Sequence, residues 1–114
     1  MKEPRILLIG RLQSTLDVLT EELRRYGRDI FATNNRSEME RLLLTEQFDF
    51  AVIGGGLDDE SRNEIVAFVK SLIPQLPVYL VPRTPGASPT MVIPFVNELA
   101  VLFKVSVASI QSSK

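Results

Sequence analysis

The sequence predicts a single α/β domain with a parallel sheet, and two observations support this fold class. Short apolar runs typical of buried strands alternate with longer segments in which apolar residues recur at helical spacing. The connections between these segments are short, which favours right-handed crossovers with helices on both faces of the sheet. A chain of 114 residues has room for one core, so we expect one domain over residues 1–114.

The first strand and the first helix have clear sequence signals. Ile6 to Ile9 is an apolar run that ends at Gly10, and it suits a strand buried on both faces. A helix is expected next, because apolar residues recur at spacings of three and four until Gly27 ends the segment. The residues of this stripe are Leu12, Leu16, Leu19, Leu23 and Tyr26.

The next segments predict two more strands and the helix between them. DIFAT, residues 29–33, predicts the second strand. Ser37 and Glu40 have the capping-box spacing, which predicts a helix over residues 38–46. FAVIG, residues 50–54, is the third strand.

A third helix and a fourth strand follow. Asp58, Asp59 and Glu60 favour a helix start, both as caps and as negative charge at the positive end of the helix dipole. Pro74 stops this helix, and PVYLV, residues 77–81, predicts the fourth strand. The buried stripe of the helix is expected to be Ile65, Phe68, Val69 and Leu72.

The alternation changes after the fourth strand. PRTPGASPT, residues 82–90, has turn composition where a fourth helix would be expected. MVIPF, residues 91–95, is a fifth apolar run interrupted by proline, and a last helix is expected from Val96 to about Ile110. The stripe expected to face the sheet is Phe95, Leu99, Leu102, Phe103, Ser106 and Ile110.

This order of elements, together with three local phrases, resembles the receiver domain of bacterial response regulators. IPFVNEL (93–99) is similar to the family's KPFxxxEL, DFAVIG (49–54) to DLVLLD, and PVYLVP (77–82) to PVIVLT. The resemblance covers nearly the whole chain. It implies a flavodoxin-like, doubly wound, five-stranded parallel sheet of order 2-1-3-4-5, with the fourth helix replaced by a loop, and a cis Ile93–Pro94 bond.

The resemblance also assigns the family's phosphorylation residues to positions in this chain, and each is replaced. Gly10 and Arg11 stand where the family has an acidic pair that holds magnesium, and Gly54 stands where it has the phosphoaccepting aspartate. Pro82 replaces the strand-four hydroxyl, and Ile93 replaces the strand-five lysine. An arginine at a magnesium position repels the ion. The resemblance therefore implies a pseudo-receiver without phosphotransfer, metal or cofactor.

Composition narrows the functional classes. The chain has no cysteine and no histidine, which removes thiolate nucleophiles, imidazole bases and the usual zinc sites, so we do not expect an enzyme. A formal charge of −1 without a basic stripe argues against nucleic-acid binding. The uninterrupted apolar runs are shorter than the roughly 20 residues that span a bilayer, so we expect a cytoplasmic protein with no membrane partner.

The glycine run after the third strand has two interpretations. It is an anion cradle, with Arg11 and Arg83 converging from neighbouring strand ends, or a loop freed from a catalytic role. The acidic residues 58–60 would repel an anion, and no GxGxxG or GxxxxGK[ST] pattern is present, so the ligand site is the less favoured interpretation. The glycines are Gly54, Gly55 and Gly56.

The outer side of the last helix carries Val101, Val105 and Ala108, where polar residues are expected if that side met only water. This strip favours a protein partner. We therefore expect a phosphorylation-independent interaction module in bacterial signalling, which forms a homodimer or docks on another signalling protein. The alternative is a small-ligand or anion sensor that binds at the glycine loop, at the carboxyl ends of the strands.

Overall fold

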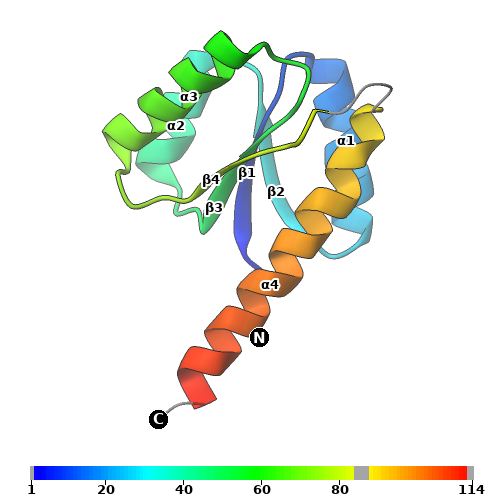
Figure 1. The fold of residues 1–114 in the computed structure, drawn as a ribbon, viewed down its shortest axis with the longest axis vertical. Coiled ribbons are helices and arrows are strands. Elements are labelled where there is room, and N and C mark those ends of the chain that lie inside the picture. Colours follow the sequence, from blue (N-terminus) through cyan, green and yellow to red (C-terminus); the bar gives the residue numbers. More distant parts are fainter. Residues whose placement is uncertain (1, 84–87, 113–114) are drawn as a thin grey trace.

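A computed structural model describes residues 2–83 and 88–112, which form a three-layer α/β domain (Figure 1). Its parallel sheet has the order β2-β1-β3-β4, as predicted for the first four strands. The strands are β1 (Arg5–Ile9), β2 (Asp29–Thr33), β3 (Phe50–Ile53) and β4 (Val78–Leu80). The helices are α1 (Gln13–Arg25), α2 (Arg36–Thr45), α3 (Asp59–Leu72) and α4 (Val92–Ser112), with a 3-10 turn at Pro89–Met91.

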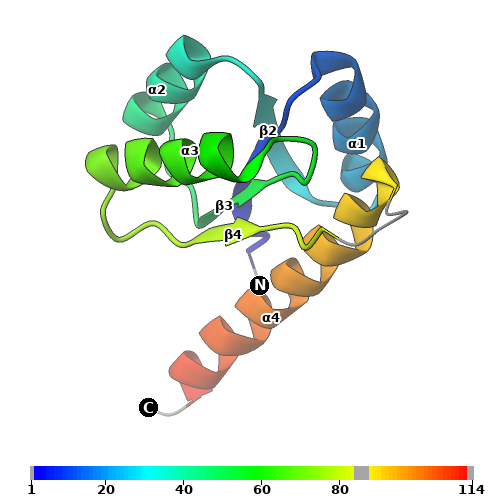
Figure 2. The ribbon, with the colours of Figure 1, turned by 45° about the horizontal axis from the view of Figure 1, so that its top comes forward.

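Helices cover both faces of the sheet (Figures 1 and 2). Side chains alternate along β1, so that Ile6 and Leu8 enter the core under α1 and α4, whereas Leu7 and Ile9 enter the core under α2 and α3. β1 pairs with both β2 and β3, and Ile6 lies opposite Phe50 in the second of these pairings. β1 is thus buried on both faces, as its unbroken apolar sequence predicts.

Two of the predicted helix ends are confirmed. In α1 the buried residues include Leu16, Leu19 and Leu23, and the left-handed φ of 83° at Gly27 ends the segment. At the start of α3 the carboxylate of Asp58 accepts a hydrogen bond of 2.7 Å from the backbone N–H of Ser61. Leu12 and Tyr26, the outermost residues of the predicted α1 stripe, are exposed.

The predicted cap of α2 is wrong. The side chain of Asn35 accepts a hydrogen bond of 3.0 Å from the N–H of Glu38, so Asn35 is the N-cap. Asn35 has an extended backbone, which suits a cap, whereas Ser37 already lies inside the helix. The helix therefore begins at Arg36.

The predicted fifth strand is also wrong. Met91 ends the 3-10 turn and residues 92–95 form the start of α4, so the last helix begins before Val96. A parallel crossover takes about a dozen residues or more, and only residues 81–90 separate β4 from Met91. Pro94 suits the first helical turn, where its missing N–H has no partner to lose, and the Ile93–Pro94 bond is trans, not cis. Residues 84–87 of the predicted loop lie outside the described residues.

α4 packs on the sheet with its first half, and its second half extends beyond the sheet (Figures 1 and 2). Val92, Val96 and Ala100 are buried in the core that α4 shares with α1. The predicted stripe is therefore only partly correct. Phe95, Leu99 and Phe103 pack at the margin of this core, but Leu102 and Ser106 are exposed, and the side chain of Ile110 is outside the described residues.

A group of polar side chains, here called the polar clamp, fixes the middle of α4. It consists of Glu3, Arg28, Asn97 and Lys104. Arg28 donates hydrogen bonds of 2.7 Å to both Glu3 and Asn97, and Lys104 also pairs with Glu3. Burial opposes the charge on Glu3, but the hydrogen bonds from Lys104 and Arg28 outweigh it and lower the pKa of this carboxyl group. The clamp joins α4 to the segment before β1.

Candidate functional site

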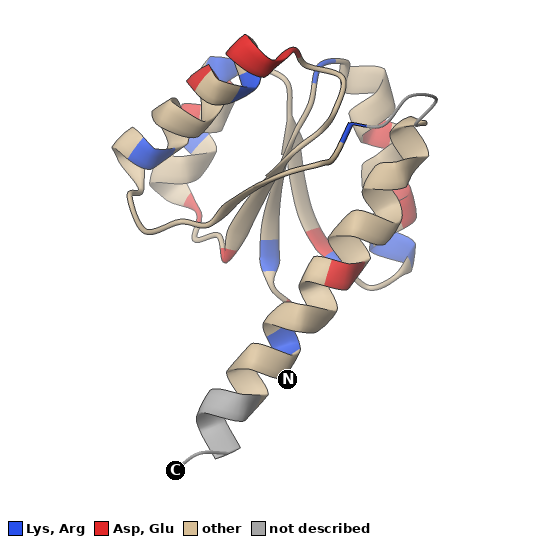
Figure 3. Ribbon diagram, viewed as in Figure 1, with Lys and Arg blue, Asp and Glu red and all other residues tan. Residues whose placement is uncertain are grey.

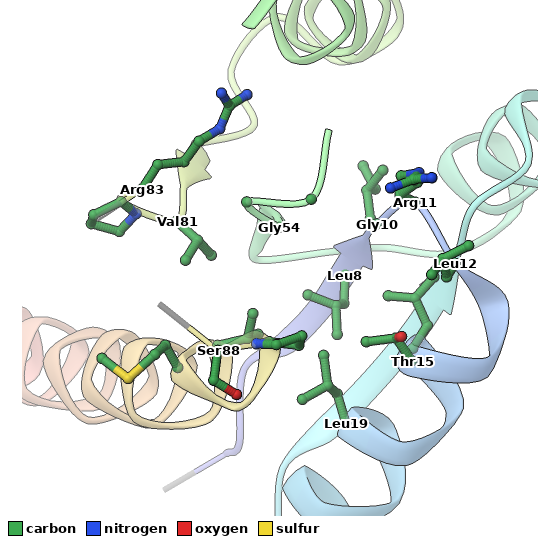
Figure 4. Close-up of a pocket in the computed structure, with 18 residues that line it drawn as sticks. Leu8, Gly10, Arg11, Leu12, Thr15, Leu19, Gly54, Val81, Arg83 and Ser88 are labelled. Atoms are coloured by element: carbon green, nitrogen blue, oxygen red, sulfur yellow. The ribbon is translucent and has the colours of Figure 1, made fainter. Parts of the chain in front are cut away.

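A cavity of about 350 Å³ opens at the carboxyl ends of β1, β3 and β4 (Figure 4). It lies where the strand order reverses, because α1 follows β1 onto one face of the sheet while α3 follows β3 onto the other. Open parallel sheets commonly bind ligands at this switch point. The position of the cavity therefore makes it the candidate binding site.

The walls of the cavity are largely apolar. They come from five parts of the chain: β1, α1, the loop after β3, the segment after β4, and the start of α4 with the turn before it. The main wall residues are Leu8, Leu16, Leu19, Val81, Met91 and Val92. Thr15 and Ser88 also line the cavity and add hydroxyl groups. A bound molecule would therefore contact mainly apolar side chains and few hydrogen-bonding groups.

The five residues predicted to form a ligand loop all line this cavity. They are Gly54, Gly55, Gly56, Arg11 and Arg83. Among the positions singled out by the resemblance to receiver domains, Gly10 and Pro82 line it as well, whereas Ile93 lies in α4 and packs against the core. The structure thus brings together all the predicted strand-end residues except Ile93.

The glycines at 54–56 leave the mouth of the cavity open without being required by the backbone. Among the described glycines only Gly27 has a positive φ. Cβ atoms added at positions 54, 55 and 56 would lie 3.6 Å from the carbonyl oxygen of Ile9, 3.5 Å from Cγ of Arg83 and 3.7 Å from Cβ of Arg11, which are ordinary contacts. A Cβ atom would therefore be accommodated at each of these positions, beside the arginines at the mouth.

The two arginines at the mouth differ in how they are bound. Arg83 donates a hydrogen bond to the carbonyl oxygen of Leu57 and lies 3.2 Å from a carboxylate oxygen of Asp59. Arg11 is exposed, and across residues 2–83 and 88–112 its guanidinium has no hydrogen-bond or ion-pair partner. Arg11 is therefore the cation that remains available to a ligand.

The start of α1 adds positive potential beside Arg11. Its N-cap residue, Leu12, makes no capping hydrogen bond through its side chain, and the first turn contains no acidic residue. The acidic residues 58–60, which weighed against an anion at α3, do not line the cavity. Asp58 instead caps α3, and the hydrogen bond from the backbone of Ser61 lowers the pKa of this carboxyl group.

Arg62, on α3, is a residue of this region that the sequence did not reveal. Its side chain is buried, with 5% of the residue exposed, and it donates a hydrogen bond of 2.8 Å to the carbonyl oxygen of Val81. Burial lowers the pKa of Arg62, and the neighbouring charge of Arg83 lowers it further. Arg62 does not line the cavity, but it holds Val81, which does.

The described residues contain no group of three His, Cys, Asp or Glu side chains close enough to hold a metal ion. The acidic residues 58–60 serve other partners, since Asp58 caps α3 and Asp59 pairs with Arg83.

A second candidate surface lies on the projecting half of α4. Val101, Leu102 and Val105, here called the apolar strip, are 51%, 55% and 57% exposed. Val101 and Val105 are the predicted interface residues, Leu102 joins them unexpectedly, and Ala108, the third predicted residue, is half-buried. Figure 3 shows how few charged residues α4 carries: within its span they are Glu98 and Lys104.

The residues 89–108 also meet the length and hydropathy criteria for a membrane-spanning helix. The most apolar stretch of 18 residues within them has a mean hydropathy of 1.7, and 17% of that stretch is buried. Asn97, Glu98 and Lys104 interrupt the apolar residues of this segment, so no unbroken apolar run of membrane-spanning length marks it in the sequence. Apolar helices of soluble proteins meet the same criteria, and Val96 and Ala100 are buried against the sheet, so this observation is weak evidence for a membrane span.

A scan against protein-family models finds no match to the chain, and a search of curated proteins finds none. The interpretation of the cavity and of the apolar strip therefore depends on their own geometry. Both surfaces are formed partly by α4, at its start and in its projecting half respectively.

Proposed function

We propose that this chain is a phosphorylation-independent interaction module, resembling a receiver domain, that pairs with a second copy of itself through α4. The observation that carries the proposal is the apolar strip, whose three side chains are each more than half exposed on a helix with few charges. A helix that is apolar on all sides is normally buried on all sides. In this domain the sheet covers only one side of α4.

The end of the sheet extends the surface that needs covering. Tyr79 of β4 is 39% exposed and contacts Phe50 edge to face, with 5.6 Å between ring centroids. Phe50 in turn contacts Phe103 of α4 at 6.3 Å. A fifth strand would cover this flank of α4 and the edge of β4, and the described residues contain none. The side chains of the flank are therefore available to a partner.

A second copy is the occupant that the strip itself favours. In a two-fold pair the same surface meets itself, so an apolar strip needs no complementary charge on a different protein. Burial of apolar surface contributes about 25 cal/mol per Å², and a standard interface buries about 800 Å² on each partner. Three half-exposed side chains supply only part of that area, so the partner must also cover the flank near Tyr79.

The pseudo-receiver part of the proposal has separate support. Gly10, Arg11 and Gly54 meet at the strand ends, and none of them offers a carboxylate. An aspartyl phosphate cannot form without a carboxylate, and magnesium is disfavoured beside an unpaired arginine. Regulation of the pair by phosphorylation at this position is therefore not expected.

Light scattering at tens of micromolar tests the pairing. The parent chain should have the mass of a dimer, and Val105→Asp should have the mass of a folded monomer, because it would bury an unpaired charge in the pair. Ala67→Asp is the matched control, since it adds the same charge to an exposed position on α3 and should remain dimeric.

A parent chain that is monomeric throughout this concentration range would overturn the proposal. If that monomer also sediments with phospholipid vesicles and loses this binding on Val105→Asp, the strip contacts a membrane surface instead of a second copy. Circular dichroism of each variant establishes that it is folded.

A further inference from the structure

We infer that the cavity at the carboxyl ends of β1, β3 and β4 binds a small organic anion with an apolar body, such as an aromatic carboxylate. This inference goes beyond the proposed pairing and does not depend on it, because no residue of the apolar strip lines the cavity. The apolar body of the ligand is inferred from the interior of the cavity, and its negative charge is inferred from the one available cation.

The interior specifies the body of the ligand. Leu8, Leu19 and Val81 are buried residues from three different elements whose surfaces meet in the cavity. Apolar cavities bind apolar molecules, and one of about 150 Å³ accommodates benzene. By the same scaling, a cavity of about 350 Å³ holds a body of roughly 14 non-hydrogen atoms, the size of a two-ring aromatic acid.

The mouth specifies the charge. Arg11 is the available cation, and the first turn of α1, which contributes Thr15 to the lining, has no side-chain cap and no acidic residue. An arginine binds a carboxylate through two parallel hydrogen bonds, which are stronger than bonds between neutral groups. Figure 4 shows Arg11 and Arg83 at separate sides of the opening, with Gly54 between them.

The same features argue against a nucleotide or a free phosphate. A phosphate-rich ligand needs several cations, and the cavity lining offers Arg11 alone, since Arg83 already contacts Asp59. A fully hydrated anion also gains nothing from leucine and valine walls. One negative group on an apolar body fits both the walls and the mouth.

Titrations followed by backbone amide NMR test this inference with three probes. Naphthoate has the apolar body and the charge, naphthalenemethanol has the body without the charge, and inorganic phosphate has the charge without the body. Naphthoate should shift the amide signals of residues 10–16 and 54–56 and bind about tenfold more tightly than naphthalenemethanol, because only naphthoate pairs with Arg11. Phosphate should not saturate the site at millimolar concentration.

Two pairs of variants test the walls and the mouth separately. Thr15 is directed into the cavity in Figure 4, so Thr15→Phe should weaken naphthoate binding at least tenfold, whereas Ser14→Phe places the same ring on the exposed side of α1 and should not. Arg11→Ala should lower the affinity for naphthoate to that for naphthalenemethanol. Arg41→Ala removes an exposed charge from α2 and should leave the affinity for naphthoate unchanged. The Arg11 pair keeps the inference testable should Thr15→Phe fail to fold.

Several results would overturn it. If phosphate and naphthoate bind with equal affinity, the apolar body of the ligand contributes nothing to binding. If naphthoate and naphthalenemethanol bind the parent chain with equal affinity, the negative charge contributes nothing. No binding of naphthoate at millimolar concentration, unchanged affinity in a folded Thr15→Phe, or amide shifts confined to residues 101–105 would exclude the cavity as the site. None of these results bears on whether the chain is a dimer, so this inference and the proposed function fail independently.

Discussion

The buried guanidinium of Arg62 donates a hydrogen bond to the carbonyl oxygen of Val81 across 2.8 Å, and so ties α3 to the end of β4. The Nε atom of Arg62 is buried without a hydrogen-bond partner in the described residues. A charge in such a position is costly unless its remaining contacts are strong. The stability of the fold should therefore depend on the bond to Val81, which lies beside the cavity.

Replacing Arg62 should test that relationship. Arg62→Ala should lower the free energy of unfolding by about 3 kcal/mol, because it leaves the carbonyl group of Val81 unsatisfied and opens a void. Arg62→Met should cost less, since it fills the space and removes the buried charge. Urea denaturation of both variants measures the difference. Equal stability of Arg62→Ala and the parent chain would show that the bond contributes nothing.

The polar clamp should make stability depend on pH. Because the folded-state pKa of Glu3 is lowered, the unfolded chain binds a proton first as the pH falls below the ordinary value of 4.5. The contribution of Glu3 is thus fully present above that value and is lost as the pH falls through the folded-state pKa. Glu3→Gln should lower the free energy of unfolding by about 1 kcal/mol at pH 7, and by progressively less below pH 4.5.

Denaturation curves from pH 7 to pH 3 measure this effect. Glu64→Gln serves as the control, because Glu64 is exposed on α3 and lies outside the clamp. A Glu3→Gln penalty that stays constant across the whole range would contradict the assignment. So would an equal penalty in the Glu64 variant.

The glycines of the chain should differ in their tolerance of substitution. Gly27 has a φ of 83°, which an L-residue with a side chain rarely adopts, so Gly27→Ala should lower the free energy of unfolding by about 1 kcal/mol. Gly56→Ala is the matched control, because its new Cβ meets Arg11 at an ordinary 3.7 Å and no left-handed φ is involved. Thermal denaturation ranks the two variants, and the reverse order would refute this account.

The chain should not accept a phosphoryl group. With Gly54 at the end of β3 there is no carboxylate to form an acyl phosphate, and Arg11 disfavours the magnesium ion. Incubation with acetyl phosphate and magnesium should leave the intact mass unchanged. A base-labile adduct of one phosphoryl group would contradict the proposal of a pseudo-receiver.

Periodic and local signals predicted much of the fold. The apolar run at Ile6 to Ile9, the centre of the α1 stripe and the Asp58 cap depend on residues close in sequence, and these features appear as predicted. Leu12 and Tyr26, at the ends of the predicted stripe, are exposed instead. The strand-end glycines and arginines could also be placed together, because parallel strands end at one edge of the sheet.

Two errors have local causes. Asn35 caps α2 in place of Ser37, and the fifth strand implied by the receiver resemblance is absent because the short connection after β4 and Pro94 favour a helix there. The other errors depend on how distant parts of the chain meet. Without that strand, Leu102 faces solvent on the flank of α4. Arg62 has no sequence signal, because an arginine within a helical pattern normally faces solvent, and only the tertiary position of Val81 shows otherwise.

The end of the sheet at β4 also limits how copies of the chain can polymerise. β4 is three residues long, and Pro77 and Pro82, which lack N–H donors, stand on either side of it within one or two residues. Fibre growth by strand addition needs a long edge with a continuous row of donors and acceptors, and this edge provides neither. Crowded solutions of the protein should therefore not extend the sheet from β4 into fibrils, and contact between side chains is the mode of association left at this end of the molecule.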